Sequence, residues 1–158
     1  MITNCVIALA REAAQRRKLL ENPDLWPRAI EELMRFVSPV QGLARVTTRE
    51  VTVADVTIPA GDQVLMLYVS ANHDETVYDD PEMLDFDRDV RSHWGFGHGI
   101  HYCLGAAVAR LEIRVALQVL FANLPDYEVD EGAVERYQLV PTRCISHAPI
   151  EFEPAPAP

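Results

Sequence analysis

Phe96-Gly97-His98-Gly99-Ile100-His101-Tyr102-Cys103-Leu104-Gly105 is a glycine-rich segment that leads a single cysteine into a helix. Its three glycines relieve the backbone on both sides of the sulfur, where a tight turn or a flat ligand leaves no room for side chains. The start of a helix favours the anionic form of a thiol, because free N–H groups and the helix dipole stabilise negative charge there. Beyond Cys103, apolar residues recur at helical spacing at Leu104, Val108, Leu111, Val115 and Val119.

Composition sets the broad class of the protein. With 158 residues and 49% hydrophobic content, the chain can bury one core. Its 14 basic and 24 acidic residues give a net charge of −10, which argues against non-specific binding to nucleic acids or anionic membranes. No apolar run approaches the roughly 20 residues of a membrane span, and the stretch Met1-Ile2-Thr3-Asn4-Cys5 lacks the basic region typical of a signal peptide. Three widely spaced cysteines suit a reducing compartment, so we expect a soluble, cytoplasmic protein.

The pattern along the chain predicts helices, then strands, then the cysteine loop, a long helix and a final hairpin. Residues 1–21 are helix formers, and a second helix should carry Pro27 in its first turn and end at Ser38-Pro39. We expect strands at 45–48, 51–53, 56–58 and 64–69 that form one small antiparallel sheet. The expected class is mainly α with small antiparallel sheets (α+β), in one domain over 1–153, with an extended Pro/Ala tail at 154–158.

The cysteine loop resembles a known motif. Phe-x-x-Gly-x-x-x-Cys-x-Gly, formed here by Phe96, Gly99, Cys103 and Gly105, is similar to the haem-ligand loop of the cytochrome P-450 family. The resemblance implies haem b, with the Cys103 thiolate as the axial ligand of the iron. Such a thiolate pushes electron density through the iron and favours O–O cleavage. It also implies that Phe96 covers the thiolate side and that Gly97 belongs to the same haem-binding loop.

A second motif precedes the strands. Glu32 and Arg35 stand three apart on the second helix and therefore meet on one face. An arbitrary Glu-x-x-Arg is usually a solvated ion pair of little energetic value. The order of this helix, the strands, an arginine-bearing coil and the cysteine loop nevertheless resembles the cytochrome P-450 core. By that resemblance, Glu32, Arg35 and Arg88 form a structural ion-pair network that holds the loop.

The resemblance also implies partners for the two carboxylates of haem. Arg45 resembles a propionate-binding arginine, and a planar guanidinium suits a carboxylate. His101 resembles the second propionate donor. The ordinary alternatives are an exposed strand arginine and a loop histidine in water. His98 is left unassigned, and we expect His73, His93 and His147 to be surface or loop residues.

Two rival chemistries use the same cysteine. His98, His101 and Cys103 could belong to a zinc site, but structural zinc needs four ligands and no second Cys/His pair lies nearby. A thiolate beside histidine at a helix start could also be a nucleophile. That alternative accounts for Cys103 but not for Phe96 or the Glu32 motif.

Substrate contacts follow from the resemblance alone. The coil after the second helix, with Val40, Gln41, Leu43 and Ala44, is similar to a substrate-contacting segment. Ile145 should line the pocket from the final hairpin. Relatives usually have glycine where this chain has Cys144, and cysteine lacks glycine's access to positive φ, so we expect a reshaped hairpin tip.

The resemblance extends from about Ile2 to Phe152, but family members are much longer. We expect the chain to begin just after the acidic-threonine pair that delivers protons to oxygen, so that another segment supplies the distal pocket. The implied reaction is insertion of one oxygen atom from O2 into a small apolar substrate. Electrons would come from NAD(P)H through a reductase and a ferredoxin, which Arg110 and Arg114 could meet. The alternative is an inactive, truncated remnant that binds haem or a partner.

Overall fold

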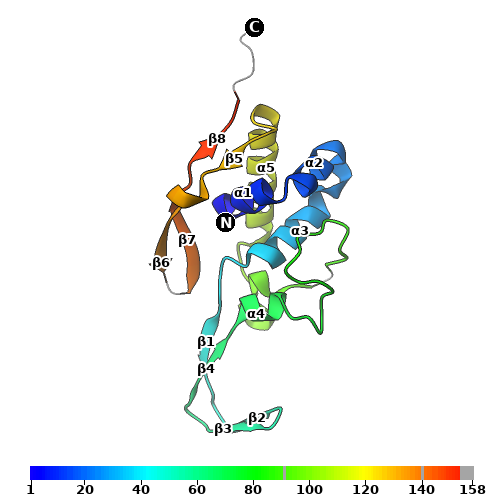
Figure 1. The fold of residues 1–158 in the computed structure, drawn as a ribbon. Helices are drawn as coiled ribbons and strands as arrows, with labels where there is room; N and C mark the ends of the chain where they lie inside the picture. Colours follow the sequence, from blue (N-terminus) through cyan, green and yellow to red (C-terminus); the bar gives the residue numbers. More distant parts are fainter. Residues whose placement is uncertain (91, 140, 154–158) are drawn as a thin grey trace.

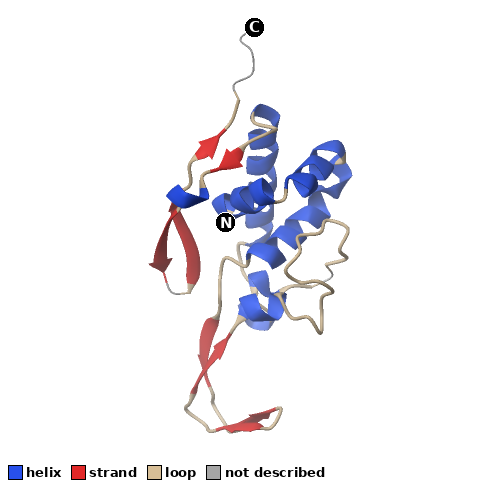
Figure 2. Ribbon diagram, viewed as in Figure 1, coloured by secondary structure: helices blue, strands red, loops and turns tan. Residues whose placement is uncertain are grey.

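The structure, a computed structural model, describes residues 1–90, 92–139 and 141–153 (Figure 1). A body of helices carries hairpins that extend from it, as the colouring by secondary structure shows (Figure 2). The α-helices of the described residues are α1 (Ile2–Arg11), α2 (Ala13–Glu21), α3 (Trp26–Val37), α4 (Tyr68–Asn72) and α5 (Ala106–Asn123). Short 3-10 turns are η1 (Pro23–Leu25), η2 (Trp94–Phe96), η3 (Gly99–His101) and η4 (Glu131–Ala133).

The strands pair as separate two-stranded antiparallel ladders. The strands are β1 (Leu43–Val46), β2 (Val51–Val53), β3 (Val56–Ile58), β4 (Gln63–Met66), β5 (Glu128–Val129), β6 (Glu135–Leu139), β7 (Thr142–His147) and β8 (Ile150–Glu151). β1 pairs with β4, β2 with β3, β5 with β8 and β6 with β7. The predicted mixture of helices and small antiparallel sheets is confirmed. The prediction of one sheet for the first four strands is wrong, because they form two ladders that project from the helical body (Figure 1).

Helix α3 forms where the sequence predicts it. Pro27 lies in its first turn, and its last residue precedes Ser38, whose left-handed backbone (φ 40°) ends the helix. The Ser38 hydroxyl donates to the Arg35 carbonyl at 2.6 Å, which satisfies one of the last free acceptors of the helix. Its apolar stripe is buried at Ile30, Leu33, Met34 and Val37.

Two element boundaries differ from the prediction. The helix expected over 1–21 breaks at Glu12 (φ −104°, ψ 58°), so that α1 can bury Cys5 and Leu9 while α2 takes another direction. The strand expected over 64–69 ends at Met66, and α4 begins at Tyr68. Tyr68 is buried, and its ring stacks on that of Trp94, so tertiary packing overrides the strand propensity of this apolar run.

Helix α5 forms as predicted, but its inward face is not the predicted stripe. The residues that it buries are Ala106, Ile113, Leu117 and Phe121. Leu104, Val108, Leu111, Val115 and Val119 are all exposed. The helix is apolar on two faces, and periodicity alone does not tell which of them meets α1 and α3.

The terminal hairpin also differs from the expectation. Cys144 lies within β7 and pairs with Tyr137, two residues away from the last pair of the ladder, Leu139 with Thr142. Cys144 is therefore not at the tip and has no positive φ, so the reason for expecting a reshaped tip does not hold. The Pro/Ala tail expected at 154–158 lies outside the described residues. None of the described helices is long and apolar enough to cross a membrane.

Candidate functional site

The thiol of Cys103 is exposed, on the segment that joins η3 to α5. Its backbone is held on both sides. The Cys103 N–H donates to the Phe96 carbonyl at 2.8 Å, and the Ala106 N–H donates to the Cys103 carbonyl at 3.2 Å. The local structure therefore presents the sulfur at the start of α5 on a closed loop, as the sequence predicts.

Two of the predicted glycines are required by backbone conformation. Gly97 has φ 71° and Gly99 has φ 64°, in the left-handed region that favours glycine. A Cβ at Gly97 would also lie 3.4 Å from the His101 carbonyl. Gly105 has φ −84°, and a Cβ there would make ordinary contact with the Cys103 sulfur at 3.9 Å. The backbone therefore does not require glycine at this position, and the part of Gly105 in haem binding stays a prediction.

The side chains around the sulfur divide into a packed side and an open side. Phe96 is buried, with its ring centroid 5.6 Å from that of His93 and 6.2 Å from that of Tyr102. Ile100 and Leu104 are fully exposed beside the exposed thiol. An exposed thiol flanked by apolar side chains fits the flat, apolar face of a haem, with the sulfur placed to ligate its iron.

The two cations expected at the haem carboxylates lie on different elements. His101 is exposed at the end of η3, within the cysteine loop. Arg45 is half-buried on β1, and its guanidinium donates to the Ala44 carbonyl at 2.9 Å. Within the described residues, no hydrogen bond joins Arg45 to His101 or Cys103. The described contacts do not bring the Arg45 and His101 side chains together.

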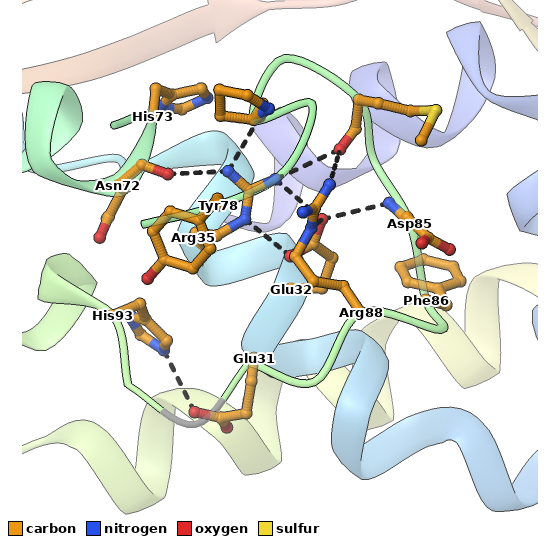
Figure 3. A network of polar contacts seen from close by, with 12 residues as sticks. Glu31, Glu32, Arg35, Asn72, His73, Tyr78, Asp85, Phe86, Arg88 and His93 are labelled. Atoms are coloured by element: carbon orange, nitrogen blue, oxygen red, sulfur yellow. Dashed lines mark hydrogen bonds and ion pairs between the residues drawn. The ribbon is translucent and has the colours of Figure 1, made fainter. Parts of the chain in front are cut away.

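The predicted ion-pair network is present (Figure 3). Arg35 makes a bidentate pair with Glu32, through Nε at 2.7 Å and Nη2 at 2.8 Å. The Nε of Arg88 donates to Glu32 Oε1 at 3.2 Å, and the Asp85 N–H donates to the same oxygen at 3.1 Å. Glu32 and Arg35 are completely buried. A buried carboxylate with this many donors satisfies the requirement that buried charges be paired.

The network ties coil segments to α3. Arg35 Nη1 donates to the carbonyls of Asn72 (2.7 Å) and Pro81 (2.9 Å), and its Nη2 donates to that of Met83 at 3.3 Å. Arg88 Nη2 donates to the Met83 carbonyl as well, also at 3.3 Å. The coil that precedes the cysteine loop is thereby fixed to the helix, through backbone carbonyls that the sequence pattern does not identify.

Asn72 connects this network to the cysteine loop and was missed from the sequence. Its side chain is completely buried. The amide Nδ2 donates to the Ser38 hydroxyl at 2.7 Å, and Oδ1 accepts from the Trp94 N–H at 2.7 Å. A lone asparagine after an apolar run carries no signal of such a role in the sequence.

His93 is a correction to the prediction. It was expected to be a surface or loop residue, and it does lie in a loop. Its side chain, however, is only 4% exposed and lies 3.1 Å from Glu31, Nε2 to Oε2 (Figure 3). Arg110, expected to face a ferredoxin, is paired with Glu31 through Nε at 2.6 Å and Nη2 at 2.8 Å. Glu31 was missed because its neighbour Glu32 fits the known motif.

The predicted substrate residues are brought together in part. Val40 forms a bridge with Thr142, and the Gln41 N–H donates to the Pro141 carbonyl at 2.8 Å, which joins the coil after α3 to the terminal hairpin. Gln41 and Ile145 line one cavity of about 540 Å³, between α1, the end of α3 and the β6–β7 hairpin. Leu43 and Ala44 lie on β1 and do not line this cavity.

Comparisons with known proteins agree with this geometry. The Cytochrome P-450 family matches residues 10–132. Cytochrome P-450 130 of Mycobacterium tuberculosis is 53% identical over 135 residues, which are 85% of this chain and 33% of the relative. Vitamin D(3) 25-hydroxylase of Pseudonocardia autotrophica is 42% identical over 160 residues, which cover 99% of this chain and 40% of the relative.

Solved structures give the same result. The structure of P450BioI in complex with an acyl carrier protein ligated to hexadec-9Z-enoic acid superposes with a TM-score of 0.90 at 37% identity. It is matched over 96% of this chain and 40% of its own. The tirandamycin C-bound monooxygenase TamI has a TM-score of 0.90 at 36% identity, over 95% of this chain and 38% of its own.

The chain belongs to the cytochrome P-450 family, whose members bind haem b through a cysteine thiolate on the iron. It spans between a third and two fifths of the length of these relatives.

Proposed function

We propose that this chain is the haem-ligating portion of a haem-thiolate monooxygenase that inserts one oxygen atom from O2 into a small apolar substrate. The exposed Cys103 thiol carries the proposal, because its loop holds it at the start of α5. Three free cysteines among the described residues are consistent with a reducing, cytoplasmic location. Bound haem would supply the activation of oxygen, and the residues of the chain would hold and orient it.

Each loop residue has a role in this proposal. Cys103 would ligate the iron, and Phe96 would keep water from the packed side of the thiolate, which tunes its electron donation. Gly97, Gly99 and Gly105 would let the haem plane approach the backbone. Arg45 and His101 would bind the haem carboxylates, because both can donate hydrogen bonds to an anion.

The network of Glu32, Arg35 and Arg88 would have a structural role. It lies within the body of the chain and fixes the coil ahead of the loop. Buried ionic networks of this kind specify geometry more than they add stability. We therefore assign these residues no part in the chemistry.

The cavity beside the terminal hairpin supports the proposed substrate contacts. Ile145 and Gln41 line it together with Phe36, Tyr137 and Cys144. Val40 would shape the cavity through its bridge to β7. Leu43 and Ala44 are exposed on β1, so their proposed contact with substrate requires the haem or another segment of the enzyme to close over them.

Electrons would reach the haem from NAD(P)H through a reductase and a ferredoxin. Arg114, on α5, remains a candidate contact for an acidic ferredoxin. Arg110 is a weaker candidate than the sequence indicates, because Glu31 neutralises its charge.

A second candidate is an inactive remnant that binds haem or a partner protein. It is favoured by the exposed apolar face of α5, formed by Val108, Leu111, Val115 and Val119, with Leu104 exposed just ahead of the helix. An apolar stripe of this length on a helix is normally covered. If the chain is instead part of a monooxygenase, another segment of the enzyme would cover this apolar face and complete the distal side of the haem.

The absorbance spectrum of the reduced, carbon-monoxide-bound protein tests the proposal. A strongly red-shifted Soret band in the wild-type chain, lost in Cys103→Ser, is the expected result. No haem uptake, or a band that Cys103→Ser leaves unchanged, would contradict the proposed function. Product formation then separates the enzyme from the remnant, if the chain is supplied with ferredoxin, reductase and a distal segment taken from a relative.

A further inference from the structure

Glu31 lies next to the buried network but serves a different part of the molecule. Its two carboxylate oxygens accept from Arg110 at 2.6 and 2.8 Å, and Oε2 also lies 3.1 Å from His93 Nε2. Partial burial by itself would raise the pKa of Glu31. The hydrogen bonds from Arg110 and His93 outweigh that effect and lower the pKa to about 2. The Glu31 side chain is therefore ionised, and it links α3 to His93, ahead of the loop, and to Arg110 on α5.

His93 holds the first residues of the loop. Its Nδ1 accepts from the Gly95 N–H at 3.0 Å, so Nδ1 carries no proton and Nε2–H donates to Glu31. A Cβ at Gly95 would lie 2.9 Å from His93 Nδ1 and 3.1 Å from the Met34 carbonyl. The loop therefore approaches α3 as closely as a glycine allows, and the His93 imidazole bridges the two.

Arg110 holds the last residues of the loop. Its guanidinium carbon lies 4.4 Å from the centre of the Phe96 ring, and Nη1 donates to the Tyr102 hydroxyl at 3.1 Å. The Phe96 carbonyl in turn accepts from the Cys103 N–H, and Tyr102 directly precedes Cys103. The hydrogen bond to Glu31 is the main cause that raises the pKa of Arg110, so the guanidinium stays charged. Arg110 thus contacts the loop at two residues. One is Tyr102, immediately before the thiol, and the other is Phe96, whose carbonyl accepts the hydrogen bond that closes the loop.

The Glu32 network does not duplicate these contacts. Among the described residues, the hydrogen bonds of Arg35 and Arg88 go to Glu32 and to carbonyls of residues 72 and 79–83. They come near the cysteine loop through the Asn72 side chain, which accepts from the Trp94 N–H, and through the Tyr78 ring, whose hydroxyl donates to the Ser92 carbonyl. Glu31 is the carboxylate that acts on the loop through Phe96 and Tyr102.

We propose that Glu31 is a positioning residue that fixes the Cys103 loop for haem ligation, acting through Arg110 and His93. The proposal rests on the proposed role of Cys103 as the haem ligand. Glutamine has the same shape as glutamate but presents one acceptor oxygen, so Glu31→Gln removes the bidentate pair with Arg110 while leaving an acceptor for His93. The loop should then open more often around Cys103.

Amide hydrogen exchange of the haem-free chain measures this opening directly. In Glu31→Gln, the Cys103 amide should exchange faster by about tenfold or more, as for a locally opened hydrogen bond. The Leu117 amide in the middle of α5 should change far less, which separates local opening from global destabilisation. Glu131→Gln is the matched control, because it breaks the ion pair of Glu131 with Arg11, which lies on α1. It should leave the Cys103 amide unchanged.

Coupling to Arg110 is tested by combining variants. If Glu31 acts through Arg110, adding Glu31→Gln to Arg110→Gln should raise exchange of the Cys103 amide little further. Arg110→Lys keeps the charge but not the two-pronged geometry, and it serves as the test if Glu31→Gln does not fold. Unchanged exchange of the Cys103 amide in Glu31→Gln would overturn the proposal. If Glu31→Gln does not fold, unchanged exchange in Arg110→Lys would overturn it instead. Fully additive effects of Glu31→Gln and Arg110→Gln on this amide would overturn it as well.

The haem-bound spectrum separates this proposal from the proposed function. In Glu31→Gln, a larger share of the reduced, carbon-monoxide-bound protein should lack the strongly red-shifted Soret band, at unchanged haem uptake. If Cys103→Ser abolishes that band while Glu31→Gln changes neither it nor the exchange rate, ligation by Cys103 stands and positioning by Glu31 fails. If the wild-type chain shows no such band, the proposed function fails, and faster Cys103 exchange in Glu31→Gln still supports control of the loop.

Discussion

Two adjacent glutamates on α3 have different partners because neighbouring residues of a helix point in different directions. Glu32 is completely buried and pairs with Arg35 and Arg88, whereas Glu31 is partly exposed and pairs with Arg110 and His93. The first holds the coil at 79–88, and the second holds residues 93–103, which include most of the cysteine loop. A single turn of helix therefore fixes both segments that lead to the thiol.

The buried pair makes the sharper prediction about stability. Glu32→Gln leaves the Arg35 charge buried with one acceptor oxygen fewer, and it should cost about 3 kcal/mol of unfolding free energy. Urea denaturation followed by circular dichroism measures this cost. Glu131→Gln, the same change in an exposed pair, should alter stability little. Equal losses in the two variants would contradict the structural role of Glu32.

Glu31 makes a prediction about pH. Its pKa in the folded protein, about 2, lies below the ordinary value, so its ion pair stabilises the fold above about pH 5. That contribution disappears as the pH falls toward 2 and Arg110 and His93 lose their carboxylate partner. The difference in unfolding free energy between wild type and Glu31→Gln should therefore be constant near neutral pH and shrink in acid. A difference independent of pH would contradict the assignment.

The three cysteines should differ in reactivity. Cys103 is exposed and Cys144 is half-buried, whereas Cys5 is fully buried, and burial raises the pKa of the Cys5 thiol to about 12. Iodoacetamide should therefore label Cys103 first in the native chain and Cys5 only after unfolding. Mass spectrometry of tryptic peptides over a time course gives the order. Early labelling of Cys5 would show that α1 does not pack as described.

At the scale of elements, α5 shows what periodicity can and cannot determine. The pattern predicts the helix but favours the stripe at Leu111, whereas the buried face contains Leu117. Both faces are apolar, so the choice depends on which one meets α1 and α3, and that is a tertiary property. The break at Glu12 and the start of α4 at Tyr68 were missed for the same reason.

Two identical substitutions on α5 test its orientation. Leu117→Ala empties a completely buried position and should cost about 2–5 kcal/mol of unfolding free energy. Leu111→Ala, at a position that is 54% exposed, should cost much less. Thermal or urea unfolding of the two variants gives the comparison. The reverse order would mean that the helix is packed through its other face.

At the scale of the whole molecule, the sequence predicts the two motifs better than it predicts the residues that hold them in place. Cys103 with its glycines, and Glu32 with Arg35, have fixed spacings along the chain, and both were found. Asn72, Glu31 and His93 act through contacts between segments far apart in sequence, and no spacing identifies them. Arg45 and His101 stay predictions, because only a haem would bring their roles together.

The molecule as a whole presents one packed side and one open side of the thiol. The helices and the ion pairs of Glu31 and Glu32 hold the packed side of the cysteine loop. The thiol, Ile100, Leu104 and the outer face of α5 are exposed. Since the relatives are more than twice as long as this chain, we propose that their remaining length corresponds to what covers the open side. In this proposal, the chain supplies the proximal half of the haem site.

X-ray absorption at the iron edge of the haem-loaded chain identifies the atom bound to the metal. The assignment of Cys103 as the iron ligand predicts one sulfur neighbour of the iron in the wild-type chain and in Glu131→Gln, and none in Cys103→Ser. An iron with only nitrogen and oxygen neighbours in the wild-type chain, or a sulfur neighbour that survives Cys103→Ser, would contradict it.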